Sequence, residues 1–208
     1  MSQEETLARL VSGGYLKAER IIEAMRAIRR EDFVPLAMRP YAWEDHPLPI
    51  GNGQTISAPH MYAIMLETAE IKIGDRVLEI GTGSGYGAAL LSFLTGKKGK
   101  VYSIEVVHAL AGSARKNLAR SGLDATIIEA DGRQGYPPGA PYDRILVTAA
   151  SENVPTALVE QLKLGGKMLI PVGKYFQELM LVEKSKSGVD INPILPVVFV
   201  PLTGHSER

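Results

Sequence analysis

The chain has 208 residues, and its 23 Lys and Arg balance 23 Asp and Glu, so its formal net charge is zero. Domains that bind nucleic acid through its phosphates normally carry a basic excess, so we expect no nucleic-acid partner. The lack of cysteine excludes disulfides, thiolate-ligated metals and a thiol nucleophile. Because the sequence has neither a long apolar run nor a signal-peptide pattern at its start, we expect a cytoplasmic protein without a membrane partner.

The first quarter of the chain predicts two helices followed by an irregular segment. Ser2 and Glu5 have the spacing of a capping box, which predicts a helix over residues 3–12. Apolar residues at helical spacing predict a second helix over 18–29. Prolines and glycines break the pattern between 33 and 59, and such a long loop is uncommon unless it is functional. The other interpretation of this segment is a packed Ω-loop that ties the helices to the rest of the chain.

Strands and helices alternate through the rest of the chain. Strands are expected at 76–80, 100–105, 125–130, 144–149, 167–172, 176–184 and 191–200, and helices at 60–70, 86–95, 107–121 and 154–162. This alternation predicts an α/β fold with a doubly wound, mostly parallel sheet. The last two strands, on either side of Lys186-Ser187-Gly188, are expected to form an antiparallel pair.

A glycine-rich loop, Gly81-Thr82-Gly83-Ser84-Gly85, lies between the first of these strands and a helix. Glycines at such a place let the backbone turn tightly and approach a ligand closely. The dinucleotide fingerprint GxGxxG fails from Gly81, because Tyr86 occupies its last position, but the relaxed form GxGxxA fits from Gly83 to Ala88. A nicotinamide-dependent oxidoreductase is therefore one interpretation of the loop.

Three acidic residues surround this loop. Glu105 ends the next strand, 20 residues after Gly85, where an acid accepts hydrogen bonds from the ribose of either cofactor class. Glu79 lies in the strand before the loop, where a carboxylate repels a pyrophosphate and attracts an ammonium or sulfonium group. Asp131 and Gly132 follow the third strand, in position to contact an adenine. The acids favour S-adenosylmethionine, which has no phosphate; the alternative is that they are solvated strand ends.

Other kinds of site have little support in the sequence. The histidines show no HExxH or other paired spacing, so we expect no metal site. The nucleophile elbow GxSxG is missing. Ser57 and His60 suit a Ser–His hydrolase by residue type, but the sequence assigns them no acid partner.

The segment GNGQTISAPHM (51–61) resembles the signature of the protein-L-isoaspartate O-methyltransferase family. Further similar stretches follow the family's order: GYLKAERIIEAMRAIRREDFVP (14–35), VLEIGTGSGYGAAL (77–90), ADGRQGYPPGAPYD (130–143), LKLGGKMLIPVG (162–173) and VPLTG (200–204). The resemblance covers nearly the whole chain, and GQTISAPHM is far more specific than a glycine loop. It implies a seven-stranded sheet of the class I S-adenosylmethionine-dependent methyltransferase type.

The resemblance also implies an activity. Enzymes of this family transfer a methyl group from S-adenosylmethionine to the α-carboxylate of L-isoaspartyl residues in damaged proteins, which begins the repair of these proteins. We expect D-aspartyl residues to be substrates as well. The predicted cofactor contacts are Gln54, Glu79, Gly81, Gly83, Gly85, Glu105, Asp131, Gly132 and Thr203. The predicted substrate contacts are Thr55, Ser57 and His60, with Ser57 as the catalytic residue at the reacting carboxylate. Tyr62 stands where some relatives have a second histidine, so a cofactor contact there is in doubt.

These residue types suit that chemistry. A carboxylate is ionised at neutral pH and needs no general base. The sulfonium and carboxylate charges both vanish toward the transition state, so a cation beside the carboxylate would stabilise mainly the ground state. A neutral hydroxyl such as that of Ser57 can orient the carboxylate without this penalty. We expect in-line positioning to supply most of the rate, with an extended peptide held by backbone hydrogen bonds and the 33–59 segment as a lid or substrate wall.

We divide the chain into residues 1–59, the N-terminal helices and substrate-side loop packed on the core, and residues 60–208, the S-adenosylmethionine-binding α/β domain. The two parts are expected to form one structural unit, and the protein is expected to be a monomer. Three alternatives stay open: a methyltransferase acting on another carboxylate, a nicotinamide-dependent oxidoreductase, and a cofactor-sensing protein without catalysis. The sequence leaves the order of the last two strands open.

Overall fold

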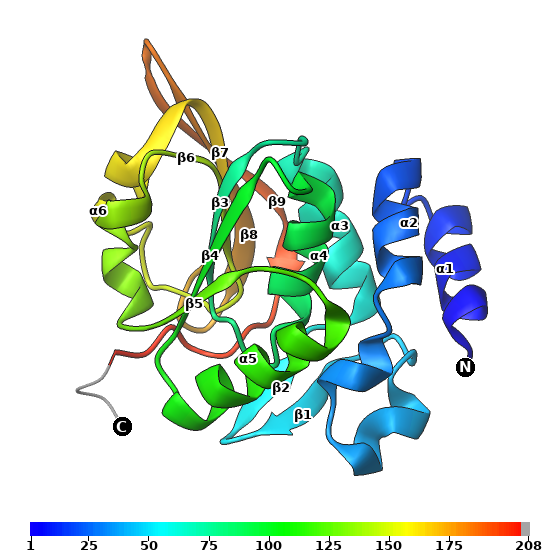
Figure 1. Cartoon of the computed structure of the whole chain (residues 1–208). Coiled ribbons are helices and arrows are strands. Elements are labelled where there is room, and N and C mark those ends of the chain that lie inside the picture. The colour runs from blue at the N-terminus through cyan, green and yellow to red at the C-terminus, as the bar shows by residue number, and fades with distance from the viewer. Residues whose placement is uncertain (205–208) are drawn as a thin grey trace.

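A computed structural model of the protein describes residues 1–204, so the last four residues of the predicted 60–208 segment lie outside it. A seven-stranded sheet, ordered β5-β4-β3-β6-β7-β8-β9, runs through the centre of the molecule (Figure 1). Its strands are β3 (Arg76–Ile80), β4 (Lys100–Glu105), β5 (Thr126–Glu129), β6 (Tyr142–Val147), β7 (Leu162–Val172), β8 (Gln177–Ser185) and β9 (Gly188–Val197). The helices are α1 (Gln3–Ser12), α2 (Glu19–Ala27), α3 (Pro59–Ala69), α4 (Tyr86–Thr95), α5 (His108–Ser121) and α6 (Thr156–Gln161).

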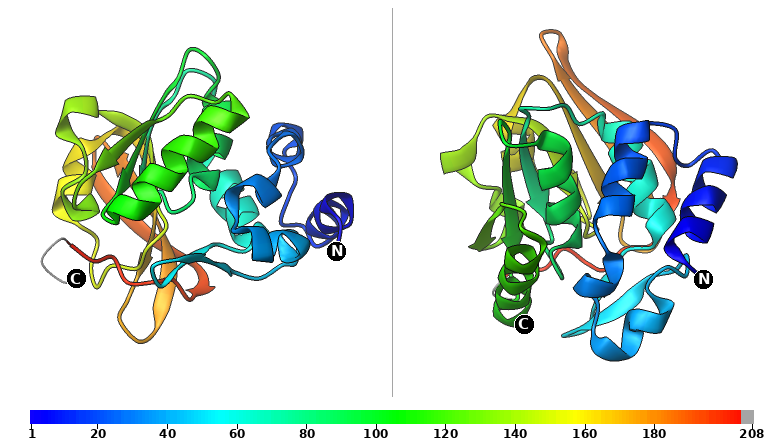
Figure 2. Two further views of the ribbon diagram at one scale, coloured as in Figure 1. Left: turned by 60° about the horizontal axis from the view of Figure 1, so that its bottom comes forward. Right: turned by 45° about the vertical axis from the view of Figure 1, so that its right-hand side comes forward.

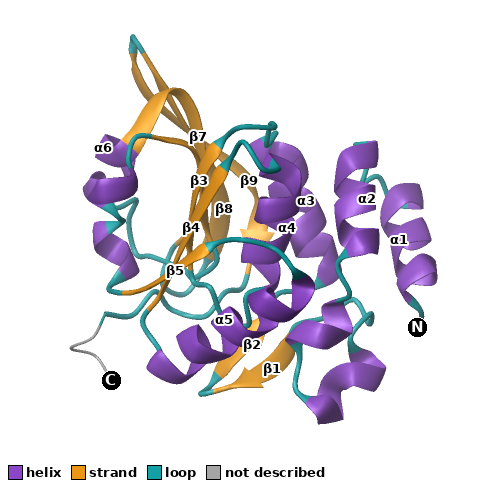
Figure 3. Cartoon of the chain, in the orientation of Figure 1, coloured by secondary structure: helices purple, strands orange, loops and turns teal. Residues whose placement is uncertain are grey.

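The pairing of the strands confirms the predicted fold class. Strands β3 to β7 are parallel to one another, and β8 is antiparallel to both β7 and β9. The chain therefore ends in the expected antiparallel strand pair, with β9 at the edge of the sheet (Figure 3). The sequence leaves the order of the last two strands open; in the structure β8 lies beside β7, and β9 lies beside β8.

Both faces of the central strands β3 and β6 are buried, which explains the runs of apolar residues in these strands. In β3, Val77 packs in the core cluster shared with α4, while its neighbour Leu78 packs in the cluster shared with α6. Helices α3 and α4 cover one face, with α2 and α1 outside them, and α6 covers the other face (Figure 1). Two further views show the same layers (Figure 2).

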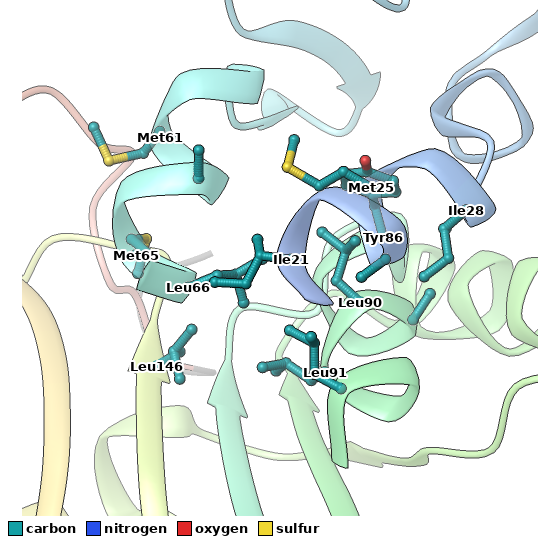
Figure 4. Close-up of a cluster of buried hydrophobic side chains, with 14 of the residues drawn as sticks. Ile21, Met25, Ile28, Met61, Met65, Leu66, Tyr86, Leu90, Leu91 and Leu146 are labelled. Atoms are coloured by element: carbon teal, nitrogen blue, oxygen red, sulfur yellow. The ribbon is translucent and has the colours of Figure 1, made fainter. Parts of the chain in front are cut away.

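The N-terminal helices share a core with the sheet. Met25 of α2, Leu66 of α3 and Leu90 of α4 belong to one group of buried side chains (Figure 4), and all three are at most 1% exposed. Leu7 of α1 and Val77 of β3 belong to the same buried cluster. The first helix also carries the predicted capping box, in which the Glu5 N–H donates to Ser2 Oγ and the Ser2 N–H donates to Glu5 Oε2. Helices α1 and α2 are thus packed on the helices that cover the sheet.

The segment 33–59 is more regular than its prolines and glycines suggest. It follows one 3₁₀ helix (Arg30–Phe33), contains a second (Leu36–Tyr41) and then forms a hairpin of β1 (Leu48–Gly51) and β2 (Gln54–Ile56). The expectation of an irregular loop was wrong at this hairpin, because strands of four and three residues give little alternation. A usable signal was present: Asn52 and Gly53, at φ 53° and 69°, are the residues that tight hairpin turns prefer.

Strand β7 begins five residues earlier than expected, at Leu162 instead of residue 167. Gly165 and Gly166 suggest a loop, but the strand continues through them as an irregularity in its register with β6. Tyr142 pairs with Leu162, whereas Arg144 pairs with Lys167. Glycines in a strand commonly mark such a bulge. The other predicted elements lie within three residues of their observed bounds.

Candidate active site

The site lies at the point where the order of the parallel strands reverses. From β3 the chain builds β4 and β5 on one side, and it then returns to place β6 on the other side of β3. In open α/β sheets, ligands bind at the carboxyl ends of the strands at such a switch point. A cavity of about 50 Å³, open to solvent, lies there. Its described lining residues are Gln54, Thr55, Ile80, Gly81, Gly83, Ile104, Glu105, Val106, Gly132, Thr148, Ala149, Val200, Pro201, Leu202 and Thr203.

The glycine loop after β3 forms one side of this first cavity. Gly81 has φ 95°, and a Cβ there would lie 2.5 Å from Thr148 Oγ1. The Thr148 hydroxyl donates to the carbonyl oxygen of Gly81 at 2.8 Å and so joins the loop to the end of β6. Gly85 does not line the cavity; it precedes α4 and lets Ala114 of α5 approach, since a Cβ would lie 3.2 Å from that side chain. Gly81 and Gly83 therefore border the ligand space, and Gly85 makes room for packing.

Glu105 holds the glycine loop from the neighbouring strand. It ends β4, and its carboxylate accepts hydrogen bonds from the N–H of Gly83 at 2.8 Å and the N–H of Val107 at 2.9 Å. The residue is only 5% exposed, yet it borders the first cavity. A carboxylate offers about four acceptor positions, so both oxygens can still accept from a ligand hydroxyl.

Gln54, Gly132 and Thr203 also border the first cavity, as predicted residues drawn from three separate segments. A Cβ at Gly132 would lie 2.3 Å from Ile80 Cγ2, so only glycine fits against the end of β3. Asp131 lies behind this surface and is not part of the lining. Its carboxylate accepts from the backbone N–H of Arg133 at 3.0 Å and from the guanidinium of the same residue at 2.7 Å.

Glu79 is buried, whereas the sequence suggests a charged carboxylate beside the loop. It is 2% exposed, and a Cβ at Gly87 of α4 would lie 1.9 Å from its Oε1. Its Oε2 lies 2.5 Å from Ser103 Oγ, which is in turn 2.6 Å from Thr82 Oγ1 in the glycine loop. Burial raises the pKa of Glu79 to about 8, which favours the neutral acid. Glu79 therefore reaches the cavity only through Ser103 and Thr82, and its burial removes the reason to expect a negative charge there.

A second cavity, of about 370 Å³, adjoins the first. Thr55, Thr148 and Val200 line both cavities, so the two spaces meet at these side chains. The other described lining residues of the second cavity are Pro47, Ser57, Ala58, His60, Met61, Leu195, Pro196, Val197, Val198 and Phe199. The structure thus brings the three predicted substrate contacts together in the second cavity, and one of them, Thr55, also borders the cavity of the predicted cofactor contacts.

The hydroxyl of Ser57 makes no hydrogen bond within residues 1–204. Helix α3 begins after Ala58, and no side chain caps it. Ser57 therefore does not serve as the helix cap, and its hydroxyl is available to a ligand in the second cavity.

His60 is held by an acid that the sequence did not reveal. Asp45 Oδ1 accepts from both the backbone N–H and the ring Nδ1–H of His60, each at 2.9 Å. This arrangement fixes the ring and leaves Nε2 for another partner. Tyr62, the position in doubt, lines neither cavity; its ring packs edge-on against Tyr86 with centroids 5.1 Å apart. The structure gives Tyr62 a packing role in the core.

Several lining residues were not predicted. Thr148 could have been found, because it follows the strand that pairs with β3 at the switch point, where ligands bind. The segment 195–202 carries no recognisable binding pattern apart from VPLTG, and it enters both cavities only because β9 returns to this edge of the sheet. Within residues 1–204, no cluster of His, Asp or Glu is suited to hold a metal ion. No helix in the same part of the chain is long and apolar enough to cross a membrane.

Comparison with known proteins gives a consistent result over the whole chain. The family model "Protein-L-isoaspartate(D-aspartate) O-methyltransferase (PCMT)" matches residues 1–207. A protein of Ignicoccus hospitalis named protein-L-isoaspartate O-methyltransferase is 51% identical over 203 residues, which cover 96% of each chain.

Two solved structures superpose closely on this one. A crystal structure from Plasmodium falciparum, described as a protein-L-isoaspartate O-methyltransferase in complex with S-adenosyl-L-homocysteine, has a TM-score of 0.88 at 27% identity and covers 98% of this chain and 99% of its own. A second structure, named protein-L-isoaspartate O-methyltransferase, has a TM-score of 0.89 at 32% identity and covers 98% of this chain and 67% of its own. These structures confirm the predicted methyltransferase type of the fold. The chain belongs to the protein-L-isoaspartate O-methyltransferase family.

Proposed function

We propose that this protein transfers the methyl group of S-adenosylmethionine to the free α-carboxylate of L-isoaspartyl residues, and of D-aspartyl residues, in damaged proteins. The first cavity is the cofactor site and the second is the substrate site. One observation carries this proposal: the two cavities share Thr55, Thr148 and Val200, so a donor in one and an acceptor in the other would meet at a common wall.

The side chains around the first cavity fit this cofactor. Glu105 is the one charged residue among the described lining residues, and neither Lys nor Arg is present to balance a pyrophosphate. This charge pattern favours a phosphate-free cofactor over a nicotinamide dinucleotide. In the proposal, Gly81 and Gly83 border the methionine part, Glu105 accepts from the ribose hydroxyls, and Gly132 lies against the adenine.

The remaining predicted contacts support the cofactor site from its edges. Gln54 and Thr203 line the cavity from segments that are far apart in the sequence. Gly85 allows α5 to pack behind the loop, and Asp131 fixes the turn at Gly132 through Arg133. When bound, S-adenosylmethionine supplies a methyl group activated by the positive charge on its sulfur.

The second cavity fits a carboxylate that reacts without a general base. Among its described lining residues there is no Lys or Arg, so no fixed cation would stabilise the substrate carboxylate before reaction. The Ser57 hydroxyl can donate to one carboxylate oxygen and orient it. The other oxygen then forms its bond to the methyl carbon as the carbon–sulfur bond breaks, and both charges disappear. His60, held by Asp45, and Thr55 would position the flanking peptide.

The apolar segment 195–200 borders the same cavity and suits an extended substrate chain. We extend the proposal to a monomeric enzyme of the cytoplasm; the zero net charge of the chain supports the further expectation that it binds no nucleic acid. The proposal is tested by incubating the purified protein with methyl-labelled S-adenosylmethionine and an isoaspartyl peptide. We expect label on the peptide as a base-labile ester; a peptide that stays unlabelled at saturating concentrations would refute the assignment.

A further inference from the structure

Three large apolar side chains lie in solvent beside the second cavity. Tyr175 and Phe176, in the turn between β7 and β8, are 86% and 94% exposed, and Val198, just beyond β9, is 93% exposed. Among the other large apolar residues of 1–204, none is more than 77% exposed. A local concentration of exposed apolar surface on a protein of this kind commonly marks a binding surface.

The three side chains belong to adjacent strand ends at the carboxyl edge of the sheet. Gln177 and Val197 form the last pair of the β8–β9 ladder at this edge, so Phe176 and Val198 follow one step beyond it. The side chain of Gln177 accepts from the N–H of Phe199 at 2.6 Å and donates to its carbonyl oxygen at 3.1 Å. In Figure 2, left, the turn between β7 and β8 protrudes beside the end of β9.

The exposed side chains of Tyr175, Phe176 and Val198 continue the wall of the second cavity, the proposed substrate site. Val198 and Phe199 line that cavity, and the Gln177 side chain joins Phe199 to the turn that carries Tyr175 and Phe176. A chain segment that leaves the cavity along residues 197–199 would therefore reach the two aromatic side chains.

The turn is held in a defined conformation before any partner binds. The Gly173 N–H donates to the carbonyl oxygen of Ser151 at 2.9 Å. Gly173 has φ 129°, and a Cβ there would lie 1.9 Å from the carbonyl oxygen of Phe176. Lys174 forms an ion pair of 2.8 Å with Glu152. A partner that contacts the aromatic rings would thus pay little ordering entropy in the turn.

We propose that Tyr175, Phe176 and Val198 form a docking surface for apolar side chains of the substrate polypeptide, in the unfolded chain that flanks the isoaspartyl residue. This inference rests on the proposed function. Apolar side chains are buried in a folded protein and exposed in an unfolded one, so the surface would favour damaged proteins that have lost their fold. The continuity with the substrate cavity is what favours this occupant over a second copy of the chain.

The test compares two enzymes on three peptides. The peptides are a short isoaspartyl peptide, the same peptide extended by a flank containing Leu and Phe, and the same peptide extended by a Ser- and Gln-rich flank. For the unaltered enzyme we expect the apolar flank to lower KM about tenfold relative to the polar flank. In the double variant Tyr175→Ser/Phe176→Ser, we expect the KM values for the apolar and the polar flank to differ by about twofold or less. The kcat of this variant and its KM for the short peptide should be unchanged.

The matched control is Ile73→Ser/Leu164→Ser, which removes two apolar side chains of 65% and 58% exposure outside both cavity linings. This variant should retain the full advantage of the apolar flank. Equal KM values for the two flanks with the unaltered enzyme, or an advantage that survives in the Tyr175/Phe176 variant, would overturn the docking surface. Sedimentation could also overturn the proposal. If the unaltered protein is a dimer and only the Tyr175→Ser/Phe176→Ser variant is a monomer, a second copy of the chain occupies the surface. Loss of methylation on all peptides by the unaltered enzyme would instead refute the proposed function.

Discussion

The carboxylate of Glu105 accepts a hydrogen bond of 2.8 Å from the backbone N–H of Gly83, in the glycine loop of the neighbouring strand. The same carboxylate borders the first cavity, so one side chain both shapes the loop and faces the proposed ribose position. A residue with both roles should be sensitive to substitution.

Replacing Glu105 with Ala should weaken binding of S-adenosylhomocysteine at least tenfold. The variant loses the anchor of the loop and the acceptors for the ribose, and hydrogen bonds to a charged group contribute about 1.5–3 kcal/mol each. Titration calorimetry measures the affinity directly. Glu129→Ala is the matched control, because Glu129 also ends a parallel strand of the sheet but lies outside both cavity linings. Equal affinities for the two variants would show that Glu105 does not contribute to cofactor binding.

Replacing Ser57 with Ala should lower kcat by about a hundredfold and leave the affinity for S-adenosylhomocysteine nearly unchanged. Because the Ser57 hydroxyl makes no hydrogen bond within residues 1–204 and α3 has no side-chain cap, the free energy of unfolding should hardly change. Kinetics and thermal unfolding of the same variant separate the two roles. A loss of about 1 kcal/mol in stability with normal turnover would instead assign Ser57 to capping the helix.

Replacing Asp45 with Ala should raise the KM for an isoaspartyl peptide about tenfold, with a smaller effect on kcat. The variant removes the acceptor that fixes the ring and backbone of His60, so His60 would occupy its productive orientation for less of the time. If Asp45 acts only through His60, the double variant Asp45→Ala/His60→Ala should be little worse than His60→Ala alone. Additive effects of the two substitutions on KM would contradict this coupling.

Glu79 should make the stability of the protein depend on pH. Its pKa in the folded state is raised to about 8 from 4.5, so the folded state binds more protons than the unfolded state between these values. Stability contributed by the neutral acid is therefore complete below about pH 4.5 and is lost as the pH rises through 8. Chemical denaturation at pH 5.5 and at pH 8.5 should show that the neutral variant Glu79→Gln gains stability relative to the unaltered protein at the higher pH. A pH-independent difference between the two proteins would mean that Glu79 is ionised in the fold.

The parts of the site that depend on local sequence were predictable. The glycine loop and Glu105 belong to one β-loop-α-β segment, so their spacing along the chain already places them at one edge of the sheet. Ser57 and His60 lie in the contiguous GQTISAPHM segment and were found for the same reason.

The unpredicted parts depend on tertiary contacts. Asp45 holds His60 across 15 residues with no motif of its own, and Thr148 reaches Gly81 only because β6 pairs with β3. The burial of Glu79 beneath Gly87 follows from how closely α4 packs on the sheet, which charge counting along the sequence does not reveal. The place of segment 195–202 in the two cavities depends on the order of the last strands, and the sequence left this order open.

The central claim is that the second cavity positions the α-carboxylate of an isoaspartyl residue beside the methyl donor. An aspartyl residue carries its free carboxylate one methylene farther from the backbone. A site that fixes the backbone would hold the two carboxylates about one bond length apart, and a displacement of about 1 Å can cost about a hundredfold in rate.

The most direct test is the initial rate of methyl transfer to two peptides that differ only in carrying isoaspartate or aspartate, with one stock of labelled S-adenosylmethionine. The account predicts a kcat/KM at least about a hundredfold higher for the isoaspartyl peptide. Comparable values of kcat/KM for the two peptides would contradict it.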